Sequence, residues 1–147
     1  MDIVIREAEK TDFIQILQLF REFAAFEKQP DAVTNSVERM IKEKDHFNCF
    51  VAETNDKRII GYATYFFTYY TWVGKCLYMD DLYVKPEFRA KGIGKRLMNS
   101  VIEFAKSSGC HKLRWQVSKW NKPAVEFYQS LGATIDDIER NCDLMLD

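Results

Sequence analysis

The sequence lacks the features of membrane, secreted and disulfide-bonded proteins. No apolar run reaches the roughly 18 residues that a membrane-spanning helix needs, and the charged start MDIVIREAEK has no signal-peptide pattern. The four cysteines include no C-x-x-C pair, and their spacing fits neither a zinc site nor a disulfide framework. Cys49 and Cys76 lie in strand-like runs, where buried, reduced thiols are expected. We therefore expect a soluble, cytoplasmic protein with no membrane partner.

The sequence also has few histidines and almost no net charge. The only histidines, His46 and His111, flank strand-like runs, so we expect surface residues and no metal site. A net charge of −1 argues against a generally basic nucleic-acid binder. Repeats, low-complexity tracts and flexible linkers are also missing. What the chain does have is 147 residues, 47% of them hydrophobic, which predicts one domain over residues 1–147 with its own core.

Hydrophobic periodicity predicts a chain in which strands and helices are mixed. Expected strands occupy residues 1–8, 47–54, 59–72, 76–85, 112–117, 133–135 and 142–146. Expected helices follow Thr11-Asp12, cover residues 33–44, run from the glycine loop to Gly109, and span residues 121–131. The three strands between residues 47 and 85 predict an antiparallel meander. The order βααβββαβαββ predicts an α/β fold with a mixed central sheet and helices on both faces.

The segment RAKGIGKR, residues 89–96, joins a strand to a helix through two glycines. It fits neither the G-x-x-x-x-G-K-[ST] phosphate loop nor the G-x-G-x-x-G dinucleotide fingerprint. Helix N termini nevertheless present free N–H groups to anions, and Gly92 and Gly94 allow close approach of the backbone. The segment therefore favours a polyanion such as a pyrophosphate. The alternative is an ordinary helix N terminus with solvated basic residues.

The pattern Arg89-x-x-Gly92-x-Gly94 after LYVKPEF resembles the acetyl-CoA loop of the GCN5-related N-acetyltransferases (GNAT), whose element order matches nearly the whole chain. Three further stretches are similar to the diamine (spermidine/spermine) and thialysine acetyltransferases: EFAAFEK, YFFTYYTWVGKCLYMDDLYV and WNKPAVEFYQSLGA. The resemblance implies an N-acetyltransferase that moves acetyl from acetyl-CoA, without a metal, to a primary amine of a small di- or polyamine or lysine-like acceptor. It also implies a homodimer.

The resemblance assigns the acetyl-CoA site to residues on both sides of the glycine loop. The loop would bind the pyrophosphate through Arg89, Ala90, Lys91, Gly92, Ile93, Gly94 and Lys95. Backbone groups of Leu82, Tyr83 and Val84 would pair with the pantetheine arm, and the Leu82 amide would polarise the thioester carbonyl. Asn121 and Ala124 would contact the cofactor from the other side, with Tyr128 as general acid toward the thiolate. From the residues alone, Tyr128 also fits a core aromatic.

The resemblance assigns the acceptor site to acids and aromatics: Phe26, Glu27, Trp72, Asp80, Asp81, Arg114, Trp115 and Gln116. Strict alternation would point Asp80 and Asp81 to opposite faces, so we expect a β-bulge there, as is typical of the family. Asp80 stands where the diamine acetyltransferases carry Glu, which shortens its reach by about 1.5 Å. Asp80 or Glu27 would accept the amine proton. From the residues alone, Glu27 also fits a solvated carboxylate at a helix end.

Two other functions remain open at this point. Acetylation of protein or peptide amines needs a wide groove, which the sequence does not reveal. A CoA-binding regulatory module without catalysis would have no use for Tyr128 and the acids. A nucleotide-binding protein is the weakest alternative, because both nucleotide-loop patterns fail.

Overall fold

The computed structural model describes residues 2–147 of the chain. These residues form two compact units, of which the first ends at Gln116 and the second spans Val117–Asp147. A single domain over residues 1–147 stays a prediction.

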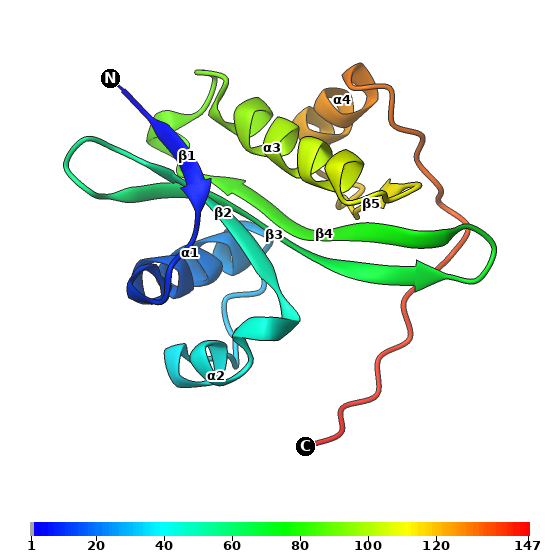
Figure 1. Ribbon diagram of the computed structural model, residues 1–147, viewed down its shortest axis with the longest axis horizontal. Helices are drawn as coiled ribbons and strands as arrows, with labels where there is room; N and C mark the ends of the chain where they lie inside the picture. The colour runs from blue at the N-terminus through cyan, green and yellow to red at the C-terminus, as the bar shows by residue number, and fades with distance from the viewer. Residues whose placement is uncertain (1) are drawn as a thin grey trace. The chain divides into compact units, whose positions relative to one another are not determined.

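The first unit is built on a five-stranded mixed sheet in the order β1-β2-β3-β4-β5 (Figure 1). Its strands are β1 (Val4–Glu7), β2 (Asn48–Glu53), β3 (Ile59–Tyr70), β4 (Gly74–Val84) and β5 (Leu113–Arg114). The first four strands pair antiparallel, which confirms the predicted meander, and β5 pairs parallel to β4. The strand predicted at 112–117 is shorter than expected because only two of its residues pair with β4.

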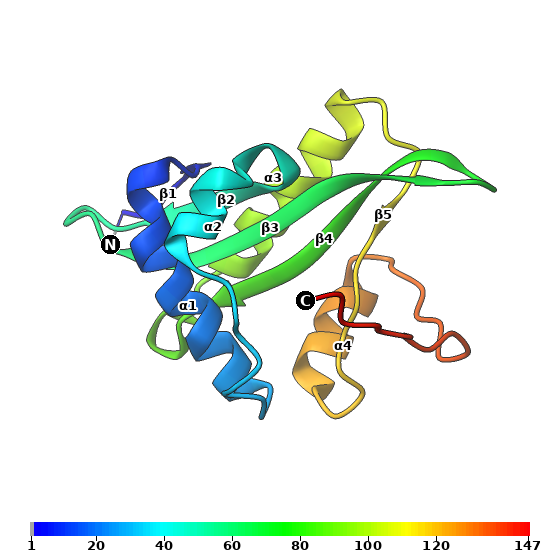
Figure 2. The ribbon, with the colours of Figure 1, turned by 90° about the horizontal axis from the view of Figure 1, so that it is seen from below.

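Helices cover both faces of this sheet, as predicted (Figures 1 and 2). They are α1 (Phe13–Phe26), α2 (Val37–Lys42) and α3 (Ile93–Ser107), with short 3₁₀ turns η1 (Lys10–Asp12), η2 (Lys44–His46) and η3 (Pro86–Phe88). Two neighbouring aromatic side chains of β3 show which helix lies on which face of the sheet. Tyr62 meets Phe20 of α1 with ring centroids 5.1 Å apart, and Tyr65 meets Phe104 of α3 at 5.0 Å.

The second helix begins later than predicted. Ser36 has an extended backbone, and its side chain accepts a hydrogen bond from the Arg39 N–H, so it is the N-cap. Residues 33–36 therefore belong to the connection from α1. Val33 and Asn35 in that connection line a cavity described below.

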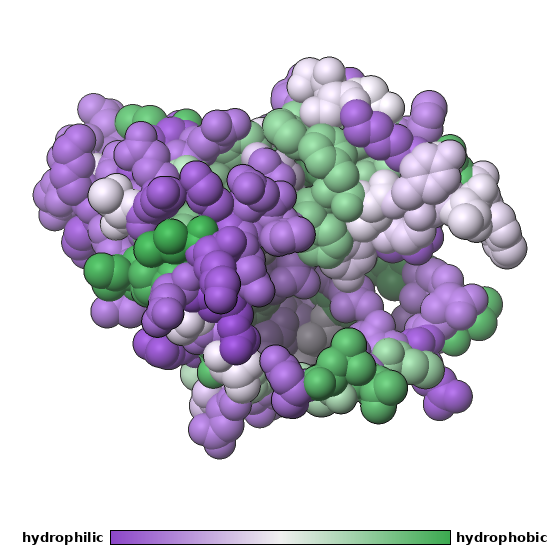
Figure 3. Space-filling model, turned by 60° about the horizontal axis from the view of Figure 1, so that its bottom comes forward, coloured by the Kyte–Doolittle hydropathy of each residue, from purple (hydrophilic) through white to green (hydrophobic). Residues whose placement is uncertain are grey.

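The core lies on both sides of the sheet. Tyr62 and Val51 are fully buried with Ile16 on the α1 side, and Tyr65 is buried on the α3 side, where Leu97 has no exposed surface. Hydrophilic residues predominate in the face drawn in Figure 3, and hydrophobic residues gather there in separate patches. Cys49 and Cys76 are buried and free, as expected.

The second unit contains α4 (Lys122–Ser130). The Asn121 side chain caps this helix by accepting a hydrogen bond from the Ala124 N–H at 3.4 Å, and Pro123 occupies the first turn. The strands predicted at 133–135 and 142–146 are wrong, because residues 131–147 form no strand. No strand of the second unit is available to pair with them, and a lone strand is not stable. Their apolar residues stay exposed, including Ile135 and Leu146.

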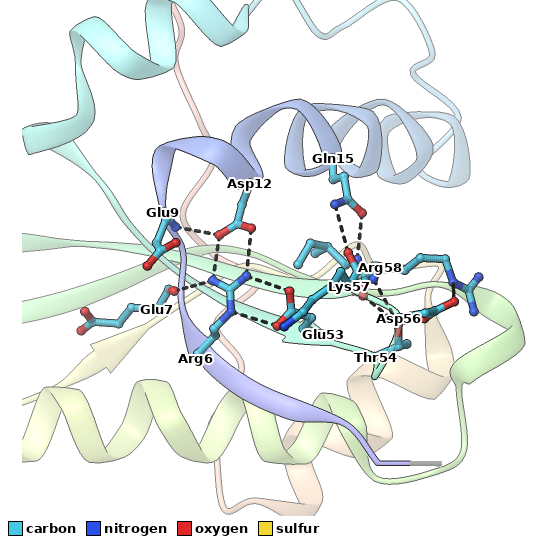
Figure 4. A network of polar contacts seen from close by, with 11 residues as sticks. Arg6, Glu7, Glu9, Asp12, Gln15, Glu53, Thr54, Asp56, Lys57 and Arg58 are labelled. Carbon is cyan, nitrogen blue, oxygen red and sulfur yellow. Dashed lines mark hydrogen bonds and ion pairs between the residues drawn. The ribbon is translucent and has the colours of Figure 1, made fainter.

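An ion cluster ties β1 to η1 and β2 (Figure 4). The Arg6 guanidinium donates to both carboxylate oxygens of Asp12, at 2.8 and 2.9 Å, and to both of Glu53, at 3.2 and 3.0 Å. Asp12 also accepts from the Glu9 N–H at 2.7 Å. The hydrogen bonds from Arg6 hold the pKa of Asp12 and that of Glu53 below their usual values.

Replacing Asp12 with Asn is expected to lower the free energy of unfolding by about 2 kcal/mol at pH 7, because charged hydrogen bonds in a buried setting are lost. The folded-state pKa of Asp12 is depressed, so this stabilisation is present above the unfolded pKa of about 4 and is lost as the pH falls through the folded value. The difference from wild type should therefore shrink in acid. Urea unfolding across a pH series measures it, with the exposed Asp31→Asn as the control; equal losses in both variants would contradict the role of the cluster.

Candidate functional site

A cavity of about 530 Å³ opens in the first unit, on the face of the sheet that α1 covers. Its wall comes from α1, the connection from α1 to α2, the end of η2 with the residue that follows it, and strands β3 and β4. The residues lining it are Phe20, Phe23, Ala24, Glu27, Gln29, Ala32, Val33, Asn35, His46, Phe47, Thr64, Phe66, Asp80 and Asp81. Three of them are carboxylates and none is Lys or Arg. The cavity is therefore suited to a cation with an apolar portion.

A β-bulge in β4 brings two of these carboxylates to one face. Thr64 pairs with Asp81 but the next residue, Tyr65, pairs with Met79, so Asp80 is the extra residue in β4. The bulge confirms the sequence expectation. Because the extra residue interrupts the alternation of side chains, both Asp80 and Asp81 line the cavity.

The bulge also places the two acids in different surroundings. Asp81 accepts a hydrogen bond from the Tyr62 hydroxyl at 3.0 Å, and its N–H donates to Thr64 Oγ1 at 3.2 Å. Asp80 has no such partner in the described part of the chain and its side chain is exposed to the cavity. Burial, followed by the charge of Asp80, raises the pKa of Asp81 to about 6, although the Tyr62 hydrogen bond opposes the shift. Desolvation alone raises the pKa of Asp80.

The bulge has a second effect, on the backbone amides of β4. Before it, the Leu77 N–H points toward β5 and donates to Lys112 O at 3.0 Å. After it, the N–H groups of Asp81 and Lys85 point toward β3. Because N–H groups alternate along a strand, those of Leu82 and Val84 point toward the opposite edge. Beyond Tyr78 that edge has no strand partner among residues 2–147.

The glycine loop follows β4 and leads into the N terminus of α3. Gly92 is the N-cap with a φ of +80°, which favours glycine, and no side chain caps the helix within the described residues. The first helical hydrogen bond is donated by the Arg96 N–H to Gly92 O at 3.1 Å. The preceding N–H groups, those of Ile93, Gly94 and Lys95, are therefore oriented outward as a helix N terminus is, and can bind an anion.

Two of the basic residues around this loop are engaged by the protein itself. Arg89 Nε donates to Val84 O at 2.8 Å, and its guanidinium lies 4.8 Å from the Phe26 ring centroid. Arg96 donates to Ile3 O at 2.8 Å. Lys91 lies 5.6 Å from the Phe88 ring centroid. The backbone amides are thus the more direct anion donors, and Arg89 fastens the loop to the end of β4.

Other residues assigned to the acceptor site do not line the cavity. Trp72, in the turn between β3 and β4, is 98% exposed. Arg114 lies in β5 with its guanidinium 4.3 Å from the Tyr70 ring centroid. Phe26 ends α1 beneath Arg89. Neither Trp115 nor Gln116 lines the cavity. Their part in acceptor binding stays a prediction.

The second unit carries the remaining predicted residues. Asn121 and Ala124 form the N-cap contact of α4, and Tyr128 is a buried residue of the same helix whose ring centroid is 5.4 Å from that of Phe127. Their cofactor contacts and the acid role of Tyr128 stay predictions.

Sequence reasoning missed several cavity residues. His46 is exposed, as expected, but it also lines the cavity together with Gln29 and Asn35. Tyr62, which holds Asp81, was missed as well. The position of Tyr62 two residues before Thr64 on the same face of β3 is a signal, but only once the strand register is known. Nothing in the sequence pattern marks the three residues from loops.

Two classes of feature are not found in residues 2–147. No helix there is both long and apolar enough to cross a membrane. No group of three or more His, Cys, Asp or Glu side chains is arranged there to hold a metal ion.

Comparison with known proteins identifies the family. The family model described as the acetyltransferase (GNAT) family matches residues 12–133. A thialysine N-epsilon-acetyltransferase of Sus scrofa is 40% identical over 142 residues, which cover 89% of this chain and 84% of the relative. Human spermidine/spermine N(1)-acetyltransferase-like protein 1 is 34% identical over 139 residues, 88% of this chain but 20% of that protein.

Solved structures agree on the fold. An aminoglycoside acetyltransferase from an uncultured soil metagenomic sample, crystallised with trehalose, has a TM-score of 0.80 at 24% identity and covers 99% of this chain and 97% of its own. A Trypanosoma brucei acetyltransferase has a TM-score of 0.79 at 23% identity, covering 97% of this chain and 100% of its own. The chain therefore belongs to the acetyltransferase (GNAT) family, and it is an N-acetyltransferase.

Proposed function

We propose that this enzyme transfers acetyl from acetyl-CoA to a primary amine of a small di- or polyamine or lysine-like acceptor, by direct attack in a ternary complex. The observation that carries the proposal is the cavity lined by Glu27, Asp80 and Asp81 without any Lys or Arg. Such a lining attracts ammonium groups and disfavours neutral or acidic acceptors. The relatives are named as thialysine N-epsilon-acetyltransferases and as a spermidine/spermine N(1)-acetyltransferase-like protein. These names support the same class of acceptor.

On the acceptor side, the acids have two tasks. A free alkylamine has a pKa near 10.4, so it arrives protonated and must lose a proton before it attacks. Asp80, whose carboxylate faces the cavity without a partner in the described chain, accepts that proton, directly or through water. Asp81, held by Tyr62, and Glu27 bind a second positive charge of the acceptor.

On the cofactor side, the backbone supplies the donors. The uncapped N terminus of α3 fits a pyrophosphate, and the open edge of β4 fits an extended pantetheine arm. When bound, acetyl-CoA supplies an acetyl group activated as a thioester. The Leu82 N–H, directed to the open edge, is the donor for the oxyanion that develops on the carbonyl. Asn121 and Ala124 complete the site, and Tyr128 donates a proton to the leaving thiolate.

The bonds balance without a further reactant. The amine nitrogen forms a bond to the acetyl carbonyl carbon, and the carbon–sulfur bond of the thioester breaks. The ammonium loses one proton to Asp80 before the attack, and the nitrogen loses a second proton as the tetrahedral intermediate breaks down. One of these two protons replaces the proton that Tyr128 gives to the departing sulfur, and the other is released to solvent. The products are the N-acetylated amine and free CoA thiol.

The direct test is release of CoA thiol from acetyl-CoA over a panel of monoamines, diamines, polyamines, lysine analogues and peptides. We expect diamines, polyamines or lysine analogues to give the highest kcat/KM. Faster turnover of peptides would assign the enzyme to protein or peptide acetylation. No amine-dependent release across the panel would point to a CoA-binding regulatory module.

Replacing Gly92 with Ala is expected to raise the KM for acetyl-CoA and to lower the free energy of unfolding by about 1 kcal/mol. A Cβ at Gly92 meets nothing within 4 Å, so the cost comes from the φ of +80° alone. Relaxation of that angle would redirect the N–H groups that bind the pyrophosphate. Gly94→Ala is the control for the fold, since its Cβ makes only an ordinary contact with Val84 at 3.8 Å. An unchanged KM in the Gly92 variant would argue against the loop as the pyrophosphate site.

The pH dependence of kcat/KM is expected to follow Asp81. With its pKa raised to about 6, the Asp81 carboxyl is ionised above that pH and neutral below it, and only the ionised form attracts an ammonium. For a diamine acceptor, kcat/KM should therefore fall more steeply below pH 6 in wild type than in the Asp81→Asn variant. Initial rates from pH 5 to 8 measure this. Identical profiles for the two proteins would remove Asp81 from acceptor binding.

We further propose a cytoplasmic homodimer that binds neither nucleic acid nor membranes. The net charge of −1 supports the absence of a nucleic-acid partner. Light scattering on the purified protein tests the dimer, and a monomer at micromolar concentration would reject it.

A further inference from the structure

Tyr62 lies behind the wall of the cavity and contacts the site through Asp81. Its side chain is fully buried, and it is not among the residues that line the cavity. Its hydroxyl donates a hydrogen bond to Asp81 Oδ2 at 3.0 Å. A buried hydroxyl needs a hydrogen-bond partner, which a neutral carbonyl would also provide. The partner of Tyr62 is instead a carboxylate of the cavity wall, so the contact bears on what the cavity can bind.

The ring of Tyr62 is packed against aromatic neighbours from two elements. It meets Phe20 of α1 edge-on with ring centroids 5.1 Å apart, and Tyr83 of β4 with centroids 6.2 Å apart. Because side chains in a close-packed core are restricted to one rotamer, the Tyr62 hydroxyl is held at one position. The hydrogen-bond donor behind Asp81 is therefore preorganised.

Strand β3 holds Asp81 at two points. Tyr62 holds the carboxylate oxygen Oδ2, and Thr64 accepts a hydrogen bond from the Asp81 N–H at 3.2 Å. The other carboxylate oxygen, Oδ1, has no donor among residues 2–147 and is the atom left for a ligand. The carboxylate of Asp80 has no comparable partner in that part of the chain. One acid of the bulge is therefore fixed, and the other is not.

The charges around Asp81 favour its neutral form. Asp80 precedes it in β4, Glu27 at the end of α1 lines the same cavity, and His46 of η2 is the one base in the lining. Burial and the charges of Asp80 and Glu27 raise the pKa of Asp81, and the hydrogen bond from Tyr62 opposes them. Tyr62 therefore supports the ionised carboxylate, which is the form that attracts an ammonium.

Tyr62 itself remains a hydrogen-bond donor at neutral pH. Burial first, and then the charge of Asp81, raises the pKa of its hydroxyl well above the usual value. Cys49 of β2 and Asp80 act in the same direction. A phenol that stays protonated can donate to a carboxylate but cannot take up the proton of an ammonium. Its contribution to the site is therefore made through Asp81.

We propose that Tyr62 is a positioning residue of the acceptor site: its hydroxyl keeps Asp81 as the carboxylate that anchors an ammonium group, so that the proton of the attacking amine goes to Asp80. This inference rests on the proposed function, and it names the group that gives two adjacent acids different tasks. A carboxylate that accepts a hydrogen bond is a weaker base than the same carboxylate without one. Removing the hydroxyl should therefore weaken the anchor by making Asp81 easier to protonate.

The first test replaces Tyr62 with Phe, which keeps the ring and removes the hydroxyl. Loss of a hydrogen bond to a charged group should lower the acid dissociation constant of Asp81 about tenfold, which moves its titration from about pH 6 to about pH 7. Relative to wild type at the same pH, kcat/KM for a diamine should then be about fivefold lower at pH 6 and nearly restored at pH 8. The titration of Asp80 is common to both proteins and cancels in this ratio. The loss should lie in the KM for the amine more than in kcat.

Tyr65→Phe is the matched control, because Tyr65 is also buried in β3 but packs against α3, on the face of the sheet away from the cavity. Its ratio to wild type should be constant from pH 6 to 8. In the Asp81→Asn background, Tyr62→Phe should lose its pH-dependent effect, because no carboxylate remains for the hydroxyl to hold. A loss in Tyr62→Phe that is equal at every pH, or that persists in the same pH-dependent form without Asp81, would overturn the inference.

Carbon-13 NMR of the ligand-free enzyme tests the same contact without turnover. The carboxyl resonance of Asp81, assigned with Asp81→Asn, should titrate about one pH unit higher in Tyr62→Phe than in wild type. In the wild-type protein, the Cζ resonance of Tyr62 should shift with the same midpoint as that carboxyl. This second readout needs no variant. Different midpoints for the two groups would contradict the inference.

Calorimetric titration with a diamine separates this inference from the proposed function. The affinity for the diamine should be about fivefold weaker in Tyr62→Phe than in wild type at pH 6, for the same reason as kcat/KM. If binding and the NMR titration follow Tyr62 but no amine releases CoA thiol, Tyr62 still anchors the amine through Asp81 and the proposed function fails. If thiol is released and Asp81 titrates independently of Tyr62, the proposed function stands and the inference fails.

Discussion

Replacing Tyr128 with Phe is expected to lower kcat by about two to four orders of magnitude, the range that a positioned general acid contributes. The change removes only the hydroxyl, so the ring and its contact with Phe127 are kept. Without a proton donor the thiolate leaves as an anion, which raises the barrier to breakdown of the tetrahedral intermediate. Binding of acetyl-CoA should be nearly unchanged, because the hydroxyl is needed only when the sulfur departs.

Rapid-quench measurement of a single turnover and calorimetric titration with CoA separate these two effects. Tyr69→Phe is the control, because Tyr69 is 75% exposed on β3 and the same chemical change there should leave kcat intact. Turnover of the Tyr128 variant at the wild-type rate would remove Tyr128 from the acid role. A parallel loss of CoA affinity and of thermal stability would make it a structural residue of α4.

Replacing Asp80 with Asn is expected to lower kcat/KM for the amine by about two to three orders of magnitude at pH 7. Asn is nearly the same size as Asp, so the bulge and the cavity are preserved, but an amide cannot accept the proton of an ammonium. The KM for acetyl-CoA should change little, because the proposed donors to the cofactor are backbone groups of β4 and α3. Raising the pH should recover part of the activity, since free amine then forms in solution.

Asp81→Asn is the matched comparison for Asp80, one residue away on the same strand. Because the role proposed for Asp81 is to bind charge and not to take the proton, its loss should raise the KM for the amine more than it lowers kcat. Steady-state kinetics over pH 7 to 10 distinguish the two variants. If Asp80→Asn weakens acetyl-CoA binding as strongly as amine turnover, Asp80 supports the fold of β4 and the proton goes elsewhere, with Glu27 as the next candidate.

Much of the fold follows from local patterns in the sequence. The three- and four-residue spacing in α1 and α3 corresponds to helices that bury one face each, and the long apolar run of β3 corresponds to a strand covered on both faces, so local patterns are enough to find them. The prediction of two terminal strands was wrong because a strand needs a partner strand. A few apolar residues such as Leu144 and Leu146 do not reveal whether such a partner exists. The late start of α2 was set by Ser36, whose side chain caps the helix.

Some residues of the candidate site could also be found from the sequence, and others could not. Asp80, Asp81 and Glu27 could be found because the resemblance covers their neighbours in sequence, and the structure places them in one cavity. Gln29, Asn35 and His46 could not, because they come from loops with no periodicity and meet only when the chain from α1 to β2 has folded. Arg89 shows a further limit: its charge is visible in the sequence, but its hydrogen bond to Val84 is not.

The extra residue in β4 couples the two substrates of the enzyme in a way that constrains its variation. It brings a second carboxylate of β4 into the cavity and, two residues later, turns the Leu82 N–H toward the open edge. Deleting one residue would reverse both effects at once, since every amide and side chain on one side of the deletion would exchange faces. The proposed acceptor pocket can therefore diversify by substitution at position 80, for example by the length of its acid, but not by insertion or deletion there without losing the proposed oxyanion donor.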